Sequence, residues 1–353
     1  MSDADADADA EDLVDGVLDG DHRALARTIT KIENRAPGYR DLVSSLHAHT
    51  GGAEVVGVTG SPGAGKSTLV DKLATRYRDR GLTVGVIAVD PSSPYSGGAV
   101  LGDRIRMASN IGDMDVFFRS MSARGQLGGL STATGDAIKA LDAFGKDRII
   151  VETVGAGQNE VDVVRTADTV VVLVQPGSGD DVQMLKAGIL EIGDVFVVNK
   201  ADMDGVRTTV SDLQEMLHMR DGTTAVDAGH HGSGMAVGTD GETTGTDRDW
   251  DPRIVETVAT EGDGVDDLID TLTDHYDHLR TSGELDRRQR ARHAEEIRRL
   301  LRSAAAELLE DELDRYGGID ALVDEVQARE TDPYTVVDRV LDPLVDCIER
   351  SED

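Results

Sequence analysis

Short apolar runs alternate with amphipathic stretches from residue 53 onward. The runs are rich in valine and isoleucine, and each ends in polar or glycine residues: "VVGVTG", "TVGVIAVD", "RIIVETVG", "TVVVLVQP" and "DVFVVNKAD". Such near-continuous runs are typical of parallel strands that are buried on both faces. The stretches between them, such as "KSTLVDKLATRYRDRG", have helical spacing. The pattern predicts an α/β fold, a doubly wound and mainly parallel sheet whose functional loops lie at the carboxyl ends of the strands.

The part of the chain before this alternating region predicts a small helical extension. Residues 1–12 are an acidic repeat, "MSDADADADAED", and we expect a disordered tail there. In residues 13–52, Leu25, Ile29 and Ile32 recur at helical spacing, and Pro37 with Gly38 ends that helix. We therefore place an N-terminal helical extension at 13–52, ahead of the main domain at 53–283.

The main domain contains one stretch without hydrophobic periodicity. Residues 219–249 are rich in Gly, Thr and Asp, which predicts a flexible surface insertion. Beyond it, "RIVETVATEGDGVDDLIDTL" predicts a last strand, a turn and a helix. From residue 284 to residue 353 the pattern is helical, and one face carries Ile297, Leu301, Ala304 and Leu308. That face can be buried on its own domain or against a second subunit.

Charge and composition limit the kinds of molecule that this protein is expected to bind. The 353 residues contain 36 basic and 68 acidic side chains, a net charge of −32 that is spread along the chain. Such a charge repels phosphate backbones and anionic lipid, so we expect no nucleic-acid partner and no membrane partner. The spread of acid indicates adaptation to high salt; an ordinary acidic cytoplasmic protein is the alternative. With one cysteine, no membrane-length apolar stretch and no basic or apolar N-terminal region, we expect a cytoplasmic protein.

The stretch "GSPGAGKST" follows the first apolar run directly and matches the phosphate-binding pattern G-x-x-x-x-G-K-[ST]. Glycines let backbone N–H groups turn toward the phosphates, with a helix N-terminus behind them. We expect Lys66 to reach the β- and γ-phosphate oxygens as a catalytic group, and the Ser67 hydroxyl to bind magnesium. The predicted phosphate-binding residues are Gly60, Ser61, Pro62, Gly63, Ala64, Gly65, Lys66, Ser67 and Thr68.

A base-recognition motif follows at the end of a later run. Asn199-Lys200-Ala201-Asp202 comes after "VFVV", and a carboxylate at Asp202 can accept two N–H bonds that guanine offers and adenine does not. Asn199 would contact the other edge of the base, and the Lys200 stem would cover its ring. The segment Thr257, Val258 and Ala259 is a candidate backbone contact to the guanine carbonyl. The plain alternative for Asp202 is a helix cap in a loop.

Two further strand ends carry candidate magnesium and switch residues. In "VETVGAGQNE", Glu152 would lie near magnesium, the Gly155 N–H near the γ-phosphate, and Gln158 would orient the attacking water. In "VDPSSPYSGGAVLGDRIRM", Asp90 and Asp103 are candidates for the magnesium shell, directly or through water. An isolated Asp in a loop is more often a turn former or a cap.

Together these stretches resemble a known family. "GSPGAGKST", "ETVGAGQNE", "QPGSGDDVQMLKAGI" and "NKAD" are similar to the MeaB/ArgK family, the methylmalonyl-CoA mutase-associated GTPases of P-loop GTPase fold, here with a haloarchaeal-like composition. The resemblance implies a homodimer joined by the C-terminal helices at 284–353. It implies that GTP hydrolysis, with Mg2+ as cofactor, gates adenosylcobalamin delivery to methylmalonyl-CoA mutase and protects that enzyme.

The resemblance also assigns roles to single residues. Asp103 and Glu152 complete the metal environment of Ser67, and the segment 175–186 resembles an extra switch that brings Lys186 toward the nucleotide. The insertion at 219–249 is longer and more polar than the family pattern leads us to expect.

Other functions stay open at this stage. A nickel-inserting GTPase has only His230-His231 and His47-x-His49 in its favour, and the chain has no cysteine pair. A transport-linked ATPase or kinase conflicts with Asp202, because adenine cannot satisfy that carboxylate. A nucleotide-dependent scaffold with incidental hydrolysis is the third alternative.

Overall fold

The computed structural model describes residues 3–90, 113–122, 129–153, 165–177, 189–227 and 250–351. The chain divides into two compact units, Met1–Asp286 and Arg287–Asp353. The sequence placed the boundary at 283/284, three residues earlier. Among the described residues, no helix has both the length and the apolar character needed to span a membrane.

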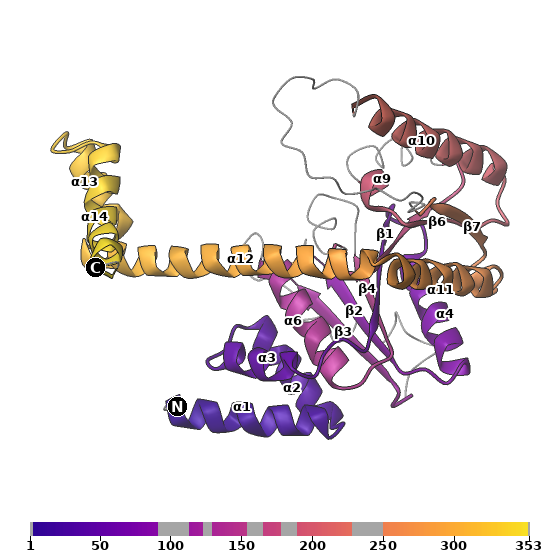
Figure 1. Cartoon of the computed structure of the whole chain (residues 1–353), viewed down its shortest axis with the longest axis horizontal. Helices are drawn as coiled ribbons and strands as arrows, with labels where there is room; N and C mark the ends of the chain where they lie inside the picture. The colour runs from indigo at the N-terminus through magenta and orange to yellow at the C-terminus, as the bar shows by residue number, and fades with distance from the viewer. Residues whose placement is uncertain are drawn as a thin grey trace, which may run out of the picture. The chain divides into compact units, whose positions relative to one another are not determined.

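The first unit is built on one parallel sheet, as the apolar runs predicted (Figure 1). Every strand pairing in it is parallel. Its seven strands have the order β3-β2-β4-β1-β5-β6-β7. In chain order they are β1 Glu54–Gly60, β2 Val84–Asp90, β3 Val116–Ser122, β4 Arg148–Thr153, β5 Thr169–Val174, β6 Val195–Asn199 and β7 Arg253–Thr257.

Strand β3 was not predicted, and its position explains why. It lies at the edge of the sheet and pairs only with β2. Phe117 and Met121 are buried while the residues between them are partly exposed. An edge strand of this kind lacks the continuous apolar run that identified the other strands.

Helices cover both faces of this sheet. One face packs on α4 and α11, and the core between them includes Val58, Leu69, Val171 and Leu272. The opposite face packs on α6 and α10, with cores formed by alternate residues of the same strands. The helices of these layers are α4 Lys66–Asp79, α6 Gly129–Ala143, α9 Ile189–Ile192, α10 Val206–Asp227 and α11 Val265–Ser282.

The N-terminal extension is helical, but it begins earlier than predicted. Its helices are α1 Asp3–Leu18, α2 His22–Glu33 and α3 Tyr39–His47, and they pack on one another and on α6. The acidic repeat expected to be disordered is therefore helical from Asp3. The physical reason is that Ala10, Leu13 and Val17 are buried on one face of α1. On another side, Asp9 forms ion pairs with Arg27 at 2.7 Å and Lys31 at 3.2 Å.

The predicted flexible insertion is also partly helical. Helix α10 continues to Asp227 and so includes the first residues of 219–249. Leu213 and Leu217 anchor this helix in the core. The rest of the insertion, 228–249, lies outside the described residues.

The second unit contains the helices predicted after residue 284. Most of α12 (Glu284–Arg315) belongs to it, followed by α13 Gly318–Gln327 and α14 Pro333–Ser351. Leu322, Val336 and Val340 form its small core. Ile297, Leu301 and Leu308, the face expected to pair, are 58%, 65% and 60% exposed in this single chain. Pairing through this face stays a prediction.

Candidate nucleotide site

The phosphate loop connects β1 to α4 and has a backbone that glycine alone tolerates well. Gly60, Gly63 and Gly65 have φ values of +135°, +78° and +96°. A Cβ on Gly60 would lie 2.0 Å from the Leu173 carbonyl oxygen, and one on Gly65 would lie 2.4 Å from the Asn199 amide nitrogen. These glycines therefore permit both the left-handed turns and the close approach of β5 and β6.

Lys66 is the first residue of α4 and is only 7% exposed. Its ammonium donates to the carbonyl oxygens of Gly60 at 2.6 Å and Ser61 at 3.1 Å. A buried cation at the positive end of a helix favours an anion in front of it. The structure thus places Lys66 inside the loop, as the motif predicted.

Ser67 and Glu152 meet at the base of the loop. Because β4 pairs with β1 in a register that places Glu152 beside Val58, the carboxylate lies next to the start of α4. The Ser67 hydroxyl donates to Glu152 Oε1 at 2.5 Å. Glu152 is 2% exposed. A hydroxyl and a carboxylate are oxygen donors of the kind that Mg2+ takes together with water and phosphate oxygens, so this pair fits the metal.

Asn199 ties the phosphate loop to the strands that carry the base motif. Its amide nitrogen donates to the Ala64 carbonyl at 2.7 Å. Its amide oxygen accepts from the Thr257 hydroxyl at 3.0 Å and from the Ala259 N–H at 3.1 Å. The sequence assigned Asn199 and Ala259 to the guanine base directly. In the structure these two groups bond to each other, and Asn199 acts as a clamp between three loops.

Lys200 and Asp202 complete the predicted base motif. Lys200 has φ +60°, which is uncommon for a residue with a side chain. Its ammonium donates to the Gly63 carbonyl and to the Gln175 amide oxygen, both at 2.7 Å. Asp202 is exposed beside this motif. The base motif and the phosphate loop are therefore joined through side chains, as required for one nucleotide to reach both.

Several predicted residues cannot be placed. Asp90 ends β2, but its side chain lies outside the described residues. Asp103, Gly155, Gln158 and Lys186 lie outside them entirely. Their assignments stay predictions. Conversely, sequence reasoning gave no role to the Gln175 side chain, which the structure brings to Lys200. The sequence feature that could have identified Gln175 is its position directly after β5, on the side of the sheet where the polar carboxyl ends of the strands meet.

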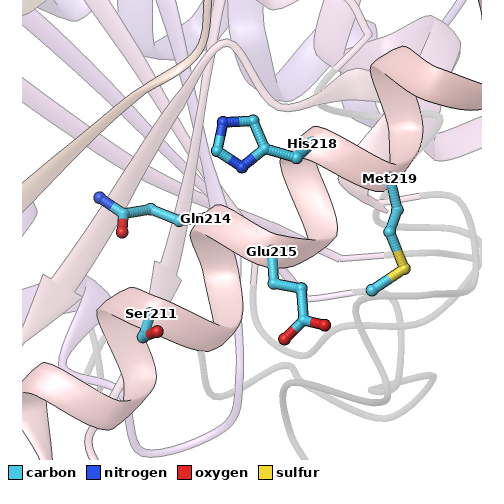
Figure 2. Close-up of a pocket in the computed structure, with 5 residues that line it drawn as sticks. All are labelled: Ser211, Gln214, Glu215, His218 and Met219. Carbon is cyan, nitrogen blue, oxygen red and sulfur yellow. The ribbon is translucent and has the colours of Figure 1, made fainter.

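A separate hollow of about 420 Å³ lies along α10. Figure 2 shows the side chains that line it, all of which project from that helix: Ser211, Gln214, Glu215, His218 and Met219. None of them belongs to the nucleotide motifs. Within the described part of the chain, no group of three or more His, Cys, Asp or Glu residues could hold a metal ion.

Comparisons with known proteins agree with this site. The model of the family described as "Methylmalonyl Co-A mutase-associated GTPase MeaB" matches residues 25–313. A putative GTPase of Pyrococcus horikoshii is 45% identical over 95% of this chain and 98% of its own length. The mitochondrial methylmalonic aciduria type A homolog of Mus musculus is 30% identical over 80% of this chain and 66% of its own length.

A solved structure shows the same fold. The crystal structure of a protein titled LAO/AO transport system kinase superposes with a TM-score of 0.62 at 25% identity, covering 96% of this chain and 98% of that one. The family match spans most of the chain and includes the phosphate loop, Glu152 and the base motif. The chain therefore belongs to the MeaB family of methylmalonyl-CoA mutase-associated GTPases and has the P-loop GTPase fold.

Proposed function

We propose that this GTPase uses Mg2+ and GTP hydrolysis to gate adenosylcobalamin delivery to methylmalonyl-CoA mutase, and that it protects the mutase. The family description and the mouse relative's name support a role with this mutase. The observation that carries the GTPase part is the Asn199 clamp, which holds the phosphate loop and the guanine motif in one site. We further propose a cytoplasmic homodimer with no nucleic-acid or membrane partner.

The phosphate end of the site would work through charge. The Lys66 ammonium, now bonded to two loop carbonyls, would turn to the β- and γ-phosphate oxygens and stabilise the charge that develops there. Ser67 and Glu152 would hold Mg2+, which when bound neutralises phosphate charge. Because Glu152 is buried, it keeps this position without competing water.

The base end of the site would select guanine. Asp202 can accept the N1 and N2 hydrogens of guanine, whereas adenine presents an acceptor at N1. An unpaired acceptor at a bound base costs about 1–3 kcal/mol, which is enough to discriminate. The protein should therefore bind GTP and GDP in preference to adenine nucleotides.

A nickel-inserting function has less support. His47 and His49 are exposed and belong to no metal-ligand group among the described residues. His230 and His231 lie outside the described residues. A scaffold in which slow hydrolysis is incidental is the other alternative. For such a scaffold, the mutase should leave the rate of GTP turnover unchanged.

The decisive experiment measures GTP turnover with and without purified mutase. The buffer contains molar KCl, because the net charge of −32 indicates adaptation to high salt. Coupling predicts faster hydrolysis by the wild type in the complex. Lys186→Ala should keep its basal turnover and respond much less to the mutase, because Lys186 is the group proposed to sense the nucleotide. An unchanged wild-type rate, or an equal response of Lys186→Ala, would contradict the gating proposal and leave only the GTPase.

The homodimer has its own test. Leu301→Glu places a charge on the exposed face of α12 without touching a buried contact. If that face joins two copies, light scattering should report a dimer for the wild type and a monomer for Leu301→Glu. Glu310→Gln, on the same helix, is the control and should leave the dimer intact. A monomeric wild type would refute the proposal.

A further inference from the structure

The Lys200 ammonium joins the ends of three neighbouring strands. Lys200 follows β6, and its Nζ donates to the Gly63 carbonyl in the loop after β1 and to the Gln175 amide oxygen directly after β5, each at 2.7 Å. Strands β1, β5 and β6 are adjacent in the sheet. One side chain of the base motif is therefore held from two sides.

The backbone at Lys200 is fixed independently of this contact. Asn199 before it forms the clamp described above, and the Ala201 N–H after it donates to the Thr257 carbonyl at 3.0 Å. These bonds hold the residue in its left-handed conformation but leave the four-carbon side chain rotatable. The position of the stem and ammonium is thus set by the two acceptors at its end.

Gln175 is itself held in place. It follows Val174, which pairs with Val198 of β6, and the next residue, Pro176, is buried. Gly177 then turns with φ +80°, and its nitrogen lies 3.7 Å from where a Cβ on Gly205 would be. The turn after Gln175 therefore packs against the turn after the base motif, and the amide is presented to Lys200.

We propose that Gln175 is a positioning residue for guanine-nucleotide binding that acts through Lys200. A lysine stem covers a base only if it stays extended along the site, and Gln175 supplies one of the two acceptors that hold it there. The amide suits this task because it is neutral: it accepts from the ammonium without adding negative charge beside the phosphates. Loss of this acceptor leaves Lys200 with Gly63 alone.

The test is a double-mutant cycle on GDP affinity, measured by calorimetry on the full chain. Gln175→Met removes the acceptor and keeps the length, and we expect GDP binding to weaken about tenfold, the low end for a hydrogen bond to a charged group. In a Lys200→Met background the same change should weaken binding less than about twofold, because the acceptor has lost its donor. In turnover, KM for GTP should rise while kcat stays near the wild-type value.

A control variant, a folding measurement and a second Gln175 variant accompany the cycle. Gln214→Met, on the exposed face of α10, should leave GDP affinity unchanged. Thermal melting reports folding, and Gln175→Ala serves as a second variant. Unchanged affinity in Gln175→Met, or an equal loss with and without Lys200, overturns the proposal. Unfolding of both Gln175 variants also overturns it, because the residue would then serve the fold.

Discussion

The strands of the sheet are parallel, so their carboxyl ends lie on one side, here called the carboxyl edge, and their amino ends on the other, here called the amino edge. These two sides use polar residues in different ways. At the carboxyl edge, a buried lysine and an asparagine bond to backbone carbonyls of the phosphate loop, Gly60, Ser61 and Ala64. At the amino edge, aspartates accept backbone N–H groups from the start of the neighbouring strand. The first arrangement holds a loop in shape for a ligand, and the second closes the ends of strands.

The amino-edge pattern repeats at three strands. Asp147 before β4 accepts from the Thr83 N–H at 2.7 Å. Asp168 before β5 accepts from Val55 at 3.0 Å, and Asp194 before β6 accepts from Val170 at 2.8 Å. Each bond satisfies a backbone N–H at the start of a strand, where the fold shields that group partly or fully from water. We conclude that the amino edge contributes stability, while the carboxyl edge contributes binding.

Two buried lysines give the sharpest test of this difference. Lys66 lies at the carboxyl edge and is 7% exposed, while Lys146 lies at the amino edge and is 3% exposed. Lys66→Ala should lower GTP turnover by about a thousandfold or more, since it removes the charge that stabilises the transferring phosphate. Because Lys66 also donates to the Gly60 and Ser61 carbonyls, its removal should lower the free energy of unfolding by about 1–3 kcal/mol, so GTP turnover is the quantity that separates the two lysines. The measurement is turnover at saturating GTP.

Lys146→Ala is the matched control. The Lys146 ammonium donates to the Asp115 carbonyl at 3.0 Å, and burial lowers its pKa. Its removal leaves that carbonyl with one partner fewer and should reduce the free energy of unfolding by about 1–3 kcal/mol, with turnover kept. If Lys146→Ala lost turnover, or Lys66→Ala kept it, the division between the edges would be wrong.

These two edges also differ in how far the sequence predicts them. The phosphate loop is local: its glycines, Lys66 and Ser67 are neighbours in the chain, and each has a backbone or side-chain requirement that few other residues meet. The base motif is equally short. Both could be recognised before the fold was known, and the parallel sheet could be predicted from its buried runs.

The amino edge could not be predicted in the same way. Asp147, Asp168 and Asp194 directly precede three of the apolar runs, but in a chain with 68 acidic residues this spacing is not distinctive. Their partners lie far away in sequence, and only the strand order identifies them. The bonds of Asn199 to Ala64 and Thr257 could not be predicted for the same reason, because these residues reach it only in the folded sheet; its contact with the base stays a prediction.

Glu54 should make the amino edge sensitive to pH. It is 2% exposed and pairs with Arg148 at 3.1 Å. Burial raises the pKa of Glu54 to about 7, against the opposing effect of Arg148. A raised pKa means that the folded state binds the proton more tightly than the unfolded state. This contribution to stability is therefore complete below about pH 4.5 and is lost as the pH rises through about 7.

The comparison of wild type with Glu54→Gln isolates this effect. Between pH 5 and pH 8 the wild type should lose about 2.5 kcal/mol of unfolding free energy relative to the variant, at about 1.4 kcal/mol per pKa unit. Denaturant titrations at several pH values measure it. Glu256→Gln, an exposed carboxylate on β7, is the control and should run parallel to the wild type. Parallel curves for Glu54→Gln would show that Glu54 stays ionised.

Asp202 tests whether the carboxyl edge reads the base. Asp202→Asn should weaken GDP binding by about a hundredfold and strengthen binding of xanthosine diphosphate, whose carbonyl replaces the guanine N2 amine. Competition binding measures both. Asp194→Asn, at the amino edge, should keep the preference for guanine while lowering stability. Equal GDP affinity in wild type and Asp202→Asn would show that another group selects the base.

The smallest expected effect comes from Trp250, the single tryptophan of the chain. Its indole N–H donates to the Asp194 carbonyl at 2.9 Å, and its ring packs edge-on against the fully buried His275 with 4.7 Å between centroids. Trp250→Phe keeps an aromatic ring but loses the donor. The free energy of unfolding should fall by about 1 kcal/mol, as for one net hydrogen bond. Thermal melting followed by circular dichroism measures it without relying on tryptophan emission.

Trp250→Phe also tests whether ligand binding at the carboxyl edge and stability at the amino edge are independent. A ligand that binds only the folded state stabilises it by an amount set by its concentration and dissociation constant. If GDP binds at the carboxyl edge and Trp250 acts at the amino edge, saturating GDP should stabilise wild type and Trp250→Phe equally. Distant sites of this kind add within about 0.5 kcal/mol. A GDP effect that differed by more would mean that the sheet transmits strain between its edges, and stability and binding could then no longer be assigned to separate edges.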